Sequence, residues 1–277
     1  MTIGIIGLGL IGGSMAKAIK LHTSHTVLGI DTDPETMTLA GLSGSIDGEL
    51  SDDELKSCDL VMAALTPRTL LRVMEQKAPH MGGTLFVDLC GIKRYVSEPL
   101  SRLAQKHGFD YVGGHPMAGK ECSGFHNASA TLFEGASMIL TPNHDSRADT
   151  LEWLKNFYLS IGFGTVTFSN IDEHDRIIAY TSQLAHITSN AYIKSPTAQM
   201  HMGFSAGSYR DLTRVARLDE GMWTELFMGN RDYLLDELRV LVDNLSDYLK
   251  VLEEGDEENM IRLLRRGREL KETAGGN

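Results

Sequence analysis

Short runs of β-branched and other apolar residues alternate with amphipathic stretches through the first 170 residues of the chain. This alternation is typical of parallel strands joined by helices that cover both faces of a sheet. We expect strands at residues 3–6, 26–30, 59–63, 84–88, 111–113, 137–140 and 165–168. The pattern therefore predicts an α/β domain with a doubly wound parallel sheet over residues 1–170.

The β-rich runs disappear from Asp172 onward, and apolar residues then recur with a helical period. Six leucines spaced by three or four residues form one stripe, namely Leu234, Leu238, Leu241, Leu245, Leu249 and Leu252. Such a stripe needs a partner surface, either within the chain or on a second copy, and we favour the second copy because few other elements remain to cover it. Gly255 should end this helix, with Asp256 capping the last one. We expect residues 171–277 to form an all-α domain that makes a homodimer through its helices.

A glycine-rich turn follows the first predicted strand and opens an apolar helix. It reads Gly7-Leu8-Gly9-Leu10-Ile11-Gly12. In a dinucleotide site the first glycine permits the tight turn, the second lets a pyrophosphate approach the backbone, and the third lets helix and strand pack closely. The alternative is a plain turn between strand and helix. The strand before the motif and the helix after it favour a Rossmann-type domain that binds a dinucleotide through this turn.

Asp31 stands at the end of the second predicted strand, about 20 residues beyond the last glycine of the turn. A carboxylate there would accept hydrogen bonds from the two hydroxyls of an adenosine ribose. It would repel a 2′-phosphate, and residues 32–36 contain no Arg or Lys that would attract one. The cofactor is therefore predicted to be NAD and not NADP.

His115 lies in a second glycine-rich segment, which follows the fifth predicted strand and runs from Gly113 to Gly119. Ligands of open α/β sheets bind at this carboxyl edge. A neutral imidazole could take the proton of a substrate hydroxyl as hydride leaves the same carbon. The alternative is a histidine that only shapes the loop.

Composition and charge narrow the function classes. The formal net charge of −11 disfavours binding to nucleic acid or to an anionic membrane surface. No apolar run is long enough to span a membrane, and the N-terminus shows no secretory signal, so we expect a cytoplasmic protein. The three cysteines, Cys58, Cys90 and Cys122, are too widely spaced for a zinc site, and we expect reduced thiols and no metal.

Three segments together give the chain a recognisable pattern. They are the opening glycine-rich turn, the run from Gly114 to Gly119 with Glu121 after it, and Asp211-Leu212-Thr213-Arg214-Val215-Ala216 with Met222-Trp223. The chain resembles the prephenate dehydrogenase family of tyrosine biosynthesis, which includes arogenate dehydrogenases, over nearly its whole length. The resemblance implies NAD-dependent oxidative decarboxylation of prephenate to 4-hydroxyphenylpyruvate, with His115 deprotonating the ring C4 hydroxyl.

The resemblance also implies where the substrate binds. Arg214 matches the substrate-binding arginine of the family, and its planar guanidinium suits a carboxylate. Arg210 and Arg217 would share its face if the segment is helical, but we assign the role to Arg214 alone. His186 matches a substrate-contacting histidine, and Glu121 matches an acidic gate at the mouth of the active site.

The chain departs from the family pattern at two positions. Gly91 stands where relatives often have a serine that bonds the catalytic histidine and the substrate, so water, backbone or Cys90 must replace that contact. Gln183 stands where relatives often have a second histidine, and we take it as a candidate substrate contact. Lys93 is retained and is expected to support the active-site loop or a ligand phosphate.

Other functions stay open on the sequence. An arogenate dehydrogenase would differ only in accepting an amino group in place of the keto group of prephenate. A β-hydroxyacid dehydrogenase or an imine reductase would also combine a dinucleotide-binding domain with helical dimerisation, though the His115 segment argues against both. A non-catalytic NAD sensor is a further alternative. Because the chain ends at Asn277, we expect no separate regulatory module, and any inhibition by tyrosine would act at the active site.

Overall fold

The computed structural model describes residues 1–275, which divide into two compact units. The first unit runs from Met1 to Asn230, and the second begins at Arg231. The last strand ends at Phe168. The first unit nevertheless continues to residue 230, so it includes the sheet and the helices that follow it up to that residue. The proposed domain extents, 1–170 and 171–277, therefore stay a prediction.

The first unit is built on one eight-stranded sheet in the order β3-β2-β1-β4-β5-β6-β7-β8. The strands are β1 (Thr2–Ile6), β2 (Thr26–Ile30), β3 (Gly48–Glu49), β4 (Leu60–Ala63), β5 (Leu85–Asp88), β6 (Asp110–Pro116), β7 (Ser137–Pro142) and β8 (Thr165–Phe168). Neighbours from β3 to β6 are parallel, whereas β7 is antiparallel to β6 and β8 is parallel to β7. The predicted doubly wound sheet is confirmed, but the strands expected at 137–140 and 165–168, now β7 and β8, run opposite to the other six. The strand order reverses at β1 and β4, which is where ligands bind in such sheets.

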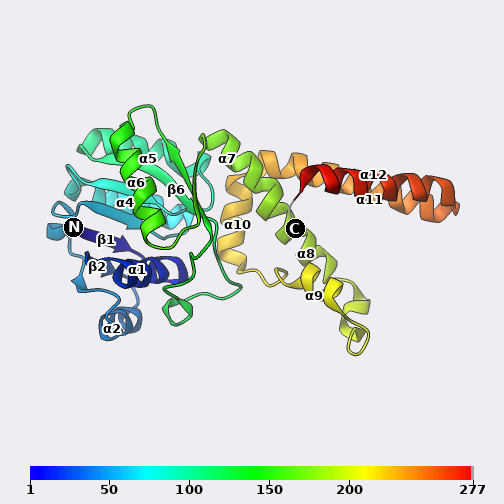
Figure 1. Cartoon of the computed structure of the whole chain (residues 1–277), viewed down its shortest axis with the longest axis horizontal. Helices are drawn as coiled ribbons and strands as arrows, with labels where there is room; N and C mark the ends of the chain where they lie inside the picture. The colour runs from blue at the N-terminus through cyan, green and yellow to red at the C-terminus, as the bar shows by residue number, and fades with distance from the viewer. Residues whose placement is uncertain (276–277) are drawn as a thin grey trace. The chain divides into compact units, whose positions relative to one another are not determined.

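Helices cover both faces of this sheet (Figure 1). One buried layer is formed by α1 (Leu10–His22), α2 (Pro34–Leu42) and α6 (Ala148–Ser160), and the other by α3 (Asp52–Leu55), α4 (Pro67–Lys77) and α5 (Arg94–His107). Short 3₁₀ turns lie at η1 (Ala78–His80) and η2 (Phe125–Asn127). Local sequence sets the helix ends, because Asp33 caps α2 ahead of Pro34, and Gly108 ends α5 in the left-handed conformation.

The chain after β8 is helical, as predicted. Asn170 caps α7 (Ile171–Ile178) by accepting a hydrogen bond from the Glu173 N–H. The helix continues through the π-helical segment η3 (Ala179–Leu184) into α8 (Ala185–Tyr192). The first unit then adds η4 (Pro196–Met200), α9 (Gly207–Thr213) and α10 (Glu220–Gly229). Because α7 packs against α5, and α10 against α4, these helices reach the sheet domain.

The second unit consists of α11 (Arg231–Glu254) and α12 (Glu257–Ala274), which pack side by side (Figure 1). Asp256 caps α12 by accepting from the Asn259 N–H at 3.0 Å, as predicted. The leucine stripe lies on α11, and its C-terminal part, Leu245, Leu249 and Leu252, is more than half exposed. Within residues 1–275, no helix is both long enough and apolar enough to cross a membrane.

Candidate active site

The glycine-rich turn between β1 and α1 has the geometry of a dinucleotide cradle. Gly7 has a φ of +86° and donates its N–H to the Ile30 carbonyl at 2.8 Å. A Cβ at Gly12 would lie 1.8 Å from the Gly7 carbonyl oxygen, so only glycine lets the helix start this close to the strand. A Cβ at Gly9 would meet nothing within 4 Å in the part of the chain that is described. The turn is thus closed toward the protein and open at Gly9.

Asp31 is tied directly to this turn. One carboxylate oxygen accepts the Leu8 N–H at 2.7 Å, and the other accepts the Asp33 N–H at 3.0 Å. Beyond Leu8, α1 begins at Leu10 and Ile11 without a capping side chain or a first-turn acid among the described residues. The first amides of a helix have no intrahelical acceptor, so they are suited to bind an anionic phosphate.

His115 lies in strand β6 and not in a loop after it. The sequence predicted a strand over residues 111–113, but β6 runs to Pro116 because β7 pairs with it in antiparallel fashion, with His115 opposite Ile139. The carboxyl ends of β1 and β6 meet at the same edge of the sheet, since β1, β4, β5 and β6 are parallel. His115 is therefore held at the edge that carries the glycine-rich turn.

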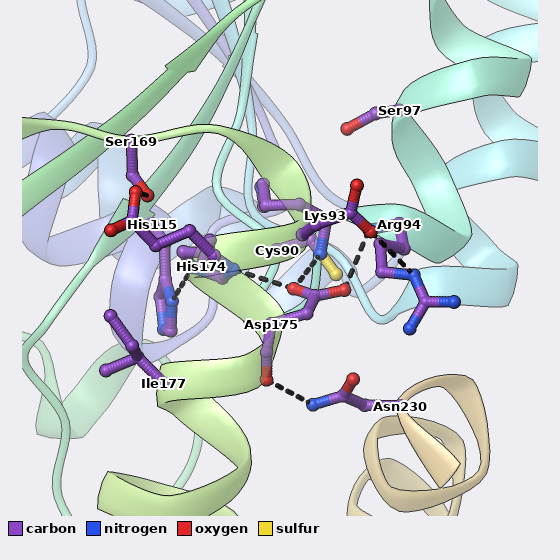
Figure 2. A network of polar contacts seen from close by, with 12 residues as sticks. Cys90, Lys93, Arg94, Ser97, His115, Ser169, His174, Asp175, Ile177 and Asn230 are labelled. Atoms are coloured by element: carbon purple, nitrogen blue, oxygen red, sulfur yellow. Dashed lines mark hydrogen bonds and ion pairs between the residues drawn. The ribbon is translucent and has the colours of Figure 1, made fainter. Parts of the chain in front are cut away.

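A chain of hydrogen bonds runs from His115 into helix α7 (Figure 2). The Nδ1 atom of His115 lies 2.9 Å from Nε2 of His174, and Nδ1 of His174 lies 2.7 Å from a carboxylate oxygen of Asp175. The side chains of His174 and Asp175 are fully buried. Neither residue is singled out by the sequence, because a His-Asp pair near the start of a helix forms no motif and only tertiary packing brings it to His115.

Backbone groups fix the carboxylate of Asp175. It accepts the N–H groups of Lys93 and Arg94, each at 2.8 Å, from the start of α5 (Figure 2). The carbonyl of Asp175 accepts the side-chain amide of Asn230 at 2.8 Å. The end of the hydrogen-bonded chain is therefore anchored to two other helical segments of the same unit.

Lys93 supports the strand ends and does not reach outward to a phosphate. Its side chain is fully buried, and Nζ donates to Asp88 and to the Gly114 carbonyl, both at 2.5 Å. The Tyr111 hydroxyl donates to the other oxygen of Asp88 at 2.8 Å. This buried group ties the end of β5 to the residue that precedes His115, so of the two predicted roles the structural one fits.

Burial is the main electrostatic influence on both histidines. It lowers the pKa of His115 well below the usual value, and the charges of His174 and Lys93 act in the same direction. Burial also lowers the pKa of His174, although the hydrogen bond to Asp175 opposes the shift. Both imidazoles are therefore neutral near pH 7, and a neutral imidazole can accept a proton.

Gly91 borders the outer nitrogen of His115. A Cβ at this position would lie 3.7 Å from Nε2 of His115 and 3.5 Å from the Leu226 side chain, which are ordinary contacts. Nε2 thus faces the place where the family pattern has a serine. The neighbouring thiol of Cys90 is buried, and burial raises its pKa to about 12, so it stays protonated there.

Three of the predicted substrate-binding residues lie together. Arg214 forms an ion pair with Glu121, and the charges of both act on the His186 imidazole. His186 Nδ1 bonds the Ser182 carbonyl at 2.8 Å, and its ring packs on Trp223 with centroids 4.0 Å apart. Burial lowers the pKa of His186. The group offers a cation paired with an acid, beside a neutral imidazole.

The remaining candidates are placed differently. Gln183 is buried, donates to the Leu226 carbonyl at 3.1 Å and accepts from Asn230 at 2.9 Å, so both ends of its amide are used inside the protein and it is a poor substrate contact. Helix α9 ends at Thr213, so Arg217 lies beyond it and the predicted common face of Arg210, Arg214 and Arg217 does not form.

Comparisons with known proteins identify two matched regions, one over the sheet and one over the helices that follow it. Residues 15–166 match the family model described as prephenate dehydrogenase, nucleotide-binding domain, and residues 170–266 match prephenate dehydrogenase, dimerization domain. The chain is 30% identical to prephenate dehydrogenase of Bacillus subtilis over 98% of its own length and 75% of the relative's. It is 29% identical to cyclohexadienyl dehydrogenase of Zymomonas mobilis, covering 88% of this chain and 86% of that one. The solved prephenate dehydrogenase of A. aeolicus, in complex with hydroxyphenyl propionate and NAD+, superposes with a TM-score of 0.83 at 24% identity, covering 99% of this chain and 98% of that one.

Proposed function

The chain belongs to the prephenate dehydrogenase family, and from this premise we propose that it oxidises prephenate with NAD and releases 4-hydroxyphenylpyruvate and CO2. It is thus an oxidoreductase of tyrosine biosynthesis. The observation that carries the proposal is the position of His115, whose Nε2 faces the space beside Gly91 at the sheet edge that also bears the glycine-rich turn. A neutral base next to a dinucleotide site suits the oxidation of a hydroxyl.

The turn from Gly7 to Gly12 fits the proposed cofactor. Gly12 brings the uncapped start of α1 close to β1, and Gly9 leaves the approach to its amides open. Asp31, held by the Leu8 N–H, would accept hydrogen bonds from the adenosine ribose and disfavour a 2′-phosphate. NAD supplies the nicotinamide ring that accepts the hydride.

In the proposed reaction His115 moves one proton. Its Nε2 accepts the proton of the C4 hydroxyl as the C4–H bond breaks and the hydride leaves, so that a carbonyl forms at C4. The C–C bond to the ring carboxylate then breaks, its electron pair completes the aromatic ring, and CO2 departs. The phenol oxygen takes a proton back, which leaves His115 neutral for the next turnover and no net proton released.

Arg214 is the proposed partner of a substrate carboxylate. Its guanidinium is two-thirds exposed and paired only with Glu121 in the described contacts. A carboxylate of prephenate would replace Glu121 at Arg214, since a guanidinium binds carboxylates in a bidentate fork. His186, which lies within electrostatic reach of both residues, is the proposed second contact. Glu121 would then act as the acidic gate.

A homodimer through the C-terminal helices is part of the proposal. The match to the dimerization domain covers residues 170–266, and leucines on α11 stay exposed in the single chain. We also place the protein in the cytoplasm, where the free thiols of Cys58, Cys90 and Cys122 would stay reduced.

The proposal is tested by following the absorbance of reduced nicotinamide with the purified protein. Prephenate and arogenate are each supplied with NAD and with NADP. Turnover of prephenate with NAD is the expected result. Turnover of arogenate alone would assign the sister activity, and a preference for NADP would contradict the role given to Asp31. NAD binding without turnover of either substrate would support the sensor alternative.

A further inference from the structure

The hydrogen bonds from His115 to Asp175 form a chain with a defined direction. A carboxylate accepts hydrogen bonds and cannot donate one, and Asp175 already accepts the N–H groups of Lys93 and Arg94. The proton between Asp175 and His174 must therefore sit on Nδ1 of the histidine, at 2.7 Å from the carboxylate. In a neutral ring this leaves Nε2 of His174 without a proton.

The same reasoning continues to the next ring. Nε2 of His174 lies 2.9 Å from Nδ1 of His115 and can only accept, so the proton between the two rings belongs to Nδ1 of His115. The outer atom of His115, Nε2, is then a bare acceptor facing the Gly91 side of the site. Free histidine side chains favour the opposite tautomer, with the proton on Nε2, so the protein selects the less stable form at both positions.

We propose that His174 and Asp175 are positioning residues that hold His115 in the Nδ1–H tautomer, so that its Nε2 is ready to accept the substrate hydroxyl proton. Calling His115 the base rests on the proposed function, but the tautomer itself does not. The buried carboxylate also stabilises the charge that His115 acquires, because the protonated ring of His115 is linked to Asp175 through His174 by two hydrogen bonds. Neither residue touches the substrate in this role.

The tautomers are measured directly by 15N NMR of protein labelled at its histidines. His115→Asn and His174→Phe each remove one signal set and assign the two rings among the ten histidines of the chain. Above pH 7, we expect both rings to show a protonated Nδ1 and an unprotonated Nε2. A protonated Nε2 on His115 in the unmodified protein would overturn the proposal, whatever reaction the protein catalyses.

His174→Phe tests the function of the chain, because it keeps an aromatic ring in the buried site but removes the acceptor. We expect the Nε2–H form of His115 to appear and kcat to fall about ten- to a hundred-fold, since acid–base groups typically contribute at least that much. KM and the Kd for NAD should change less than about threefold, because substrate and cofactor contacts are intact. His174→Gln, whose carbonyl oxygen can accept from Nδ1, should recover part of the loss.

Asp175→Asn provides an independent variant should His174→Phe fail to fold. In one orientation the new amide donates to His174, which reverses the direction of the hydrogen bonds between residue 175 and His115. In the other orientation its NH2 group meets the Arg94 N–H, so that two donors face each other. We expect a mixture of His115 tautomers and a lower kcat. Asp172→Asn is the matched control, because Asp172 lies on the same helix but is exposed and paired with Arg94. It should change neither the His115 tautomer nor kcat.

These outcomes separate the two proposals. If prephenate and arogenate are not oxidised but both rings carry Nδ1 protons, the proposed function fails and the tautomer assignment stands. If the unmodified enzyme turns over but His174→Phe and His174→Gln lose the same activity with an unchanged His115 tautomer, the two residues are merely structural and the positioning role is refuted.

Discussion

The reactivity of His115 depends on neighbours that lie far from it in the sequence. Its ring is neutral because burial lowers its pKa, and its orientation comes from His174, which is 59 residues away in the chain. Gly91 determines what lies against its outer nitrogen. The chemistry at this one side chain is therefore set by three separate segments.

Replacing His115 by Asn tests its role as the base. Asn cannot accept a proton at neutral pH, so we expect kcat to fall by about a hundred-fold or more, while KM and the Kd for NAD change little. Steady-state kinetics and NAD titration check this. A protein whose biological output persists in the variant would be a cofactor sensor, and a change mainly in KM would remove His115 from the chemical step.

Gly91→Ser adds the hydroxyl that the chain lacks, and Gly91→Ala is the matched control. The Cβ of either residue fits, because its nearest neighbours would be 3.5 and 3.7 Å away, and Gly91 does not have a positive φ. One extra neutral hydrogen bond is worth about 1 kcal/mol, so we expect Ser to lower KM about fivefold relative to Ala. Equal KM values in the two variants would show that the serine position does not contact the substrate.

The strands were the most predictable part of the fold. Seven were expected and all seven are present, two with the expected ends and the others with ends shifted by at most three residues. The central ones are buried parallel strands, which read as short apolar runs. The eighth, β3, is only two residues long and carries no such run. β6 is longer than predicted because its pairing with β7, and not its own composition, extends it through His115.

The helical half of the site was less predictable. Gln183 lies in the π-helical segment, where its amide packs toward Leu226 and Asn230, and a 3.6-residue period cannot anticipate that change of face. His174 and Asp175 matter because α7 packs on α5, which is a tertiary contact. The sequence could therefore predict which residues are candidates for the site, but the packing of the helices determines which of them contact one another.

In the turn between β1 and α1, Gly12 is required for packing and Gly9 for cofactor access, and the two roles can be tested separately. Gly12→Ala would place a methyl group 1.8 Å from the Gly7 carbonyl oxygen, and we expect it to cost about 3 kcal/mol or more of folding stability. Gly9→Ala meets no described neighbour, so stability should hold while the affinity for NAD falls about ten-fold or more, or about 1.4 kcal/mol. Urea unfolding and NAD titration separate the two. Unchanged NAD affinity in Gly9→Ala would move the pyrophosphate away from this turn.

Stability of the folded chain should depend on pH through its buried histidines. Burial lowers the pKa of His115 and His174, so below about pH 6.5 the unfolded chain takes up more protons at these rings than the folded chain does. Stability is therefore full above pH 6.5 and falls as the pH drops below it. We expect His115, whose pKa is lowered the more strongly, to contribute a loss of about 1 kcal/mol at pH 5.5, and His174 a smaller one. Urea unfolding at pH 7.5 and 5.5 measures the loss of unfolding free energy. The loss should be smaller in His174→Phe than in the unmodified protein. Equal losses in the two proteins would mean that other groups cause the pH dependence.

Assembly of two chains should depend on the leucines that α11 leaves exposed. Leu249 is 59% and Leu252 68% exposed, on a helix whose family match is a dimerization domain. Burying two such side chains against a second copy is worth about 3 kcal/mol, so Leu249→Glu with Leu252→Glu should weaken the dimer about a hundred-fold. Sedimentation at micromolar concentration should then show monomers, while the exposed polar control Asp247→Lys stays dimeric. If the double variant remains a dimer, the two copies associate through another face, and the stripe on α11 has a different partner.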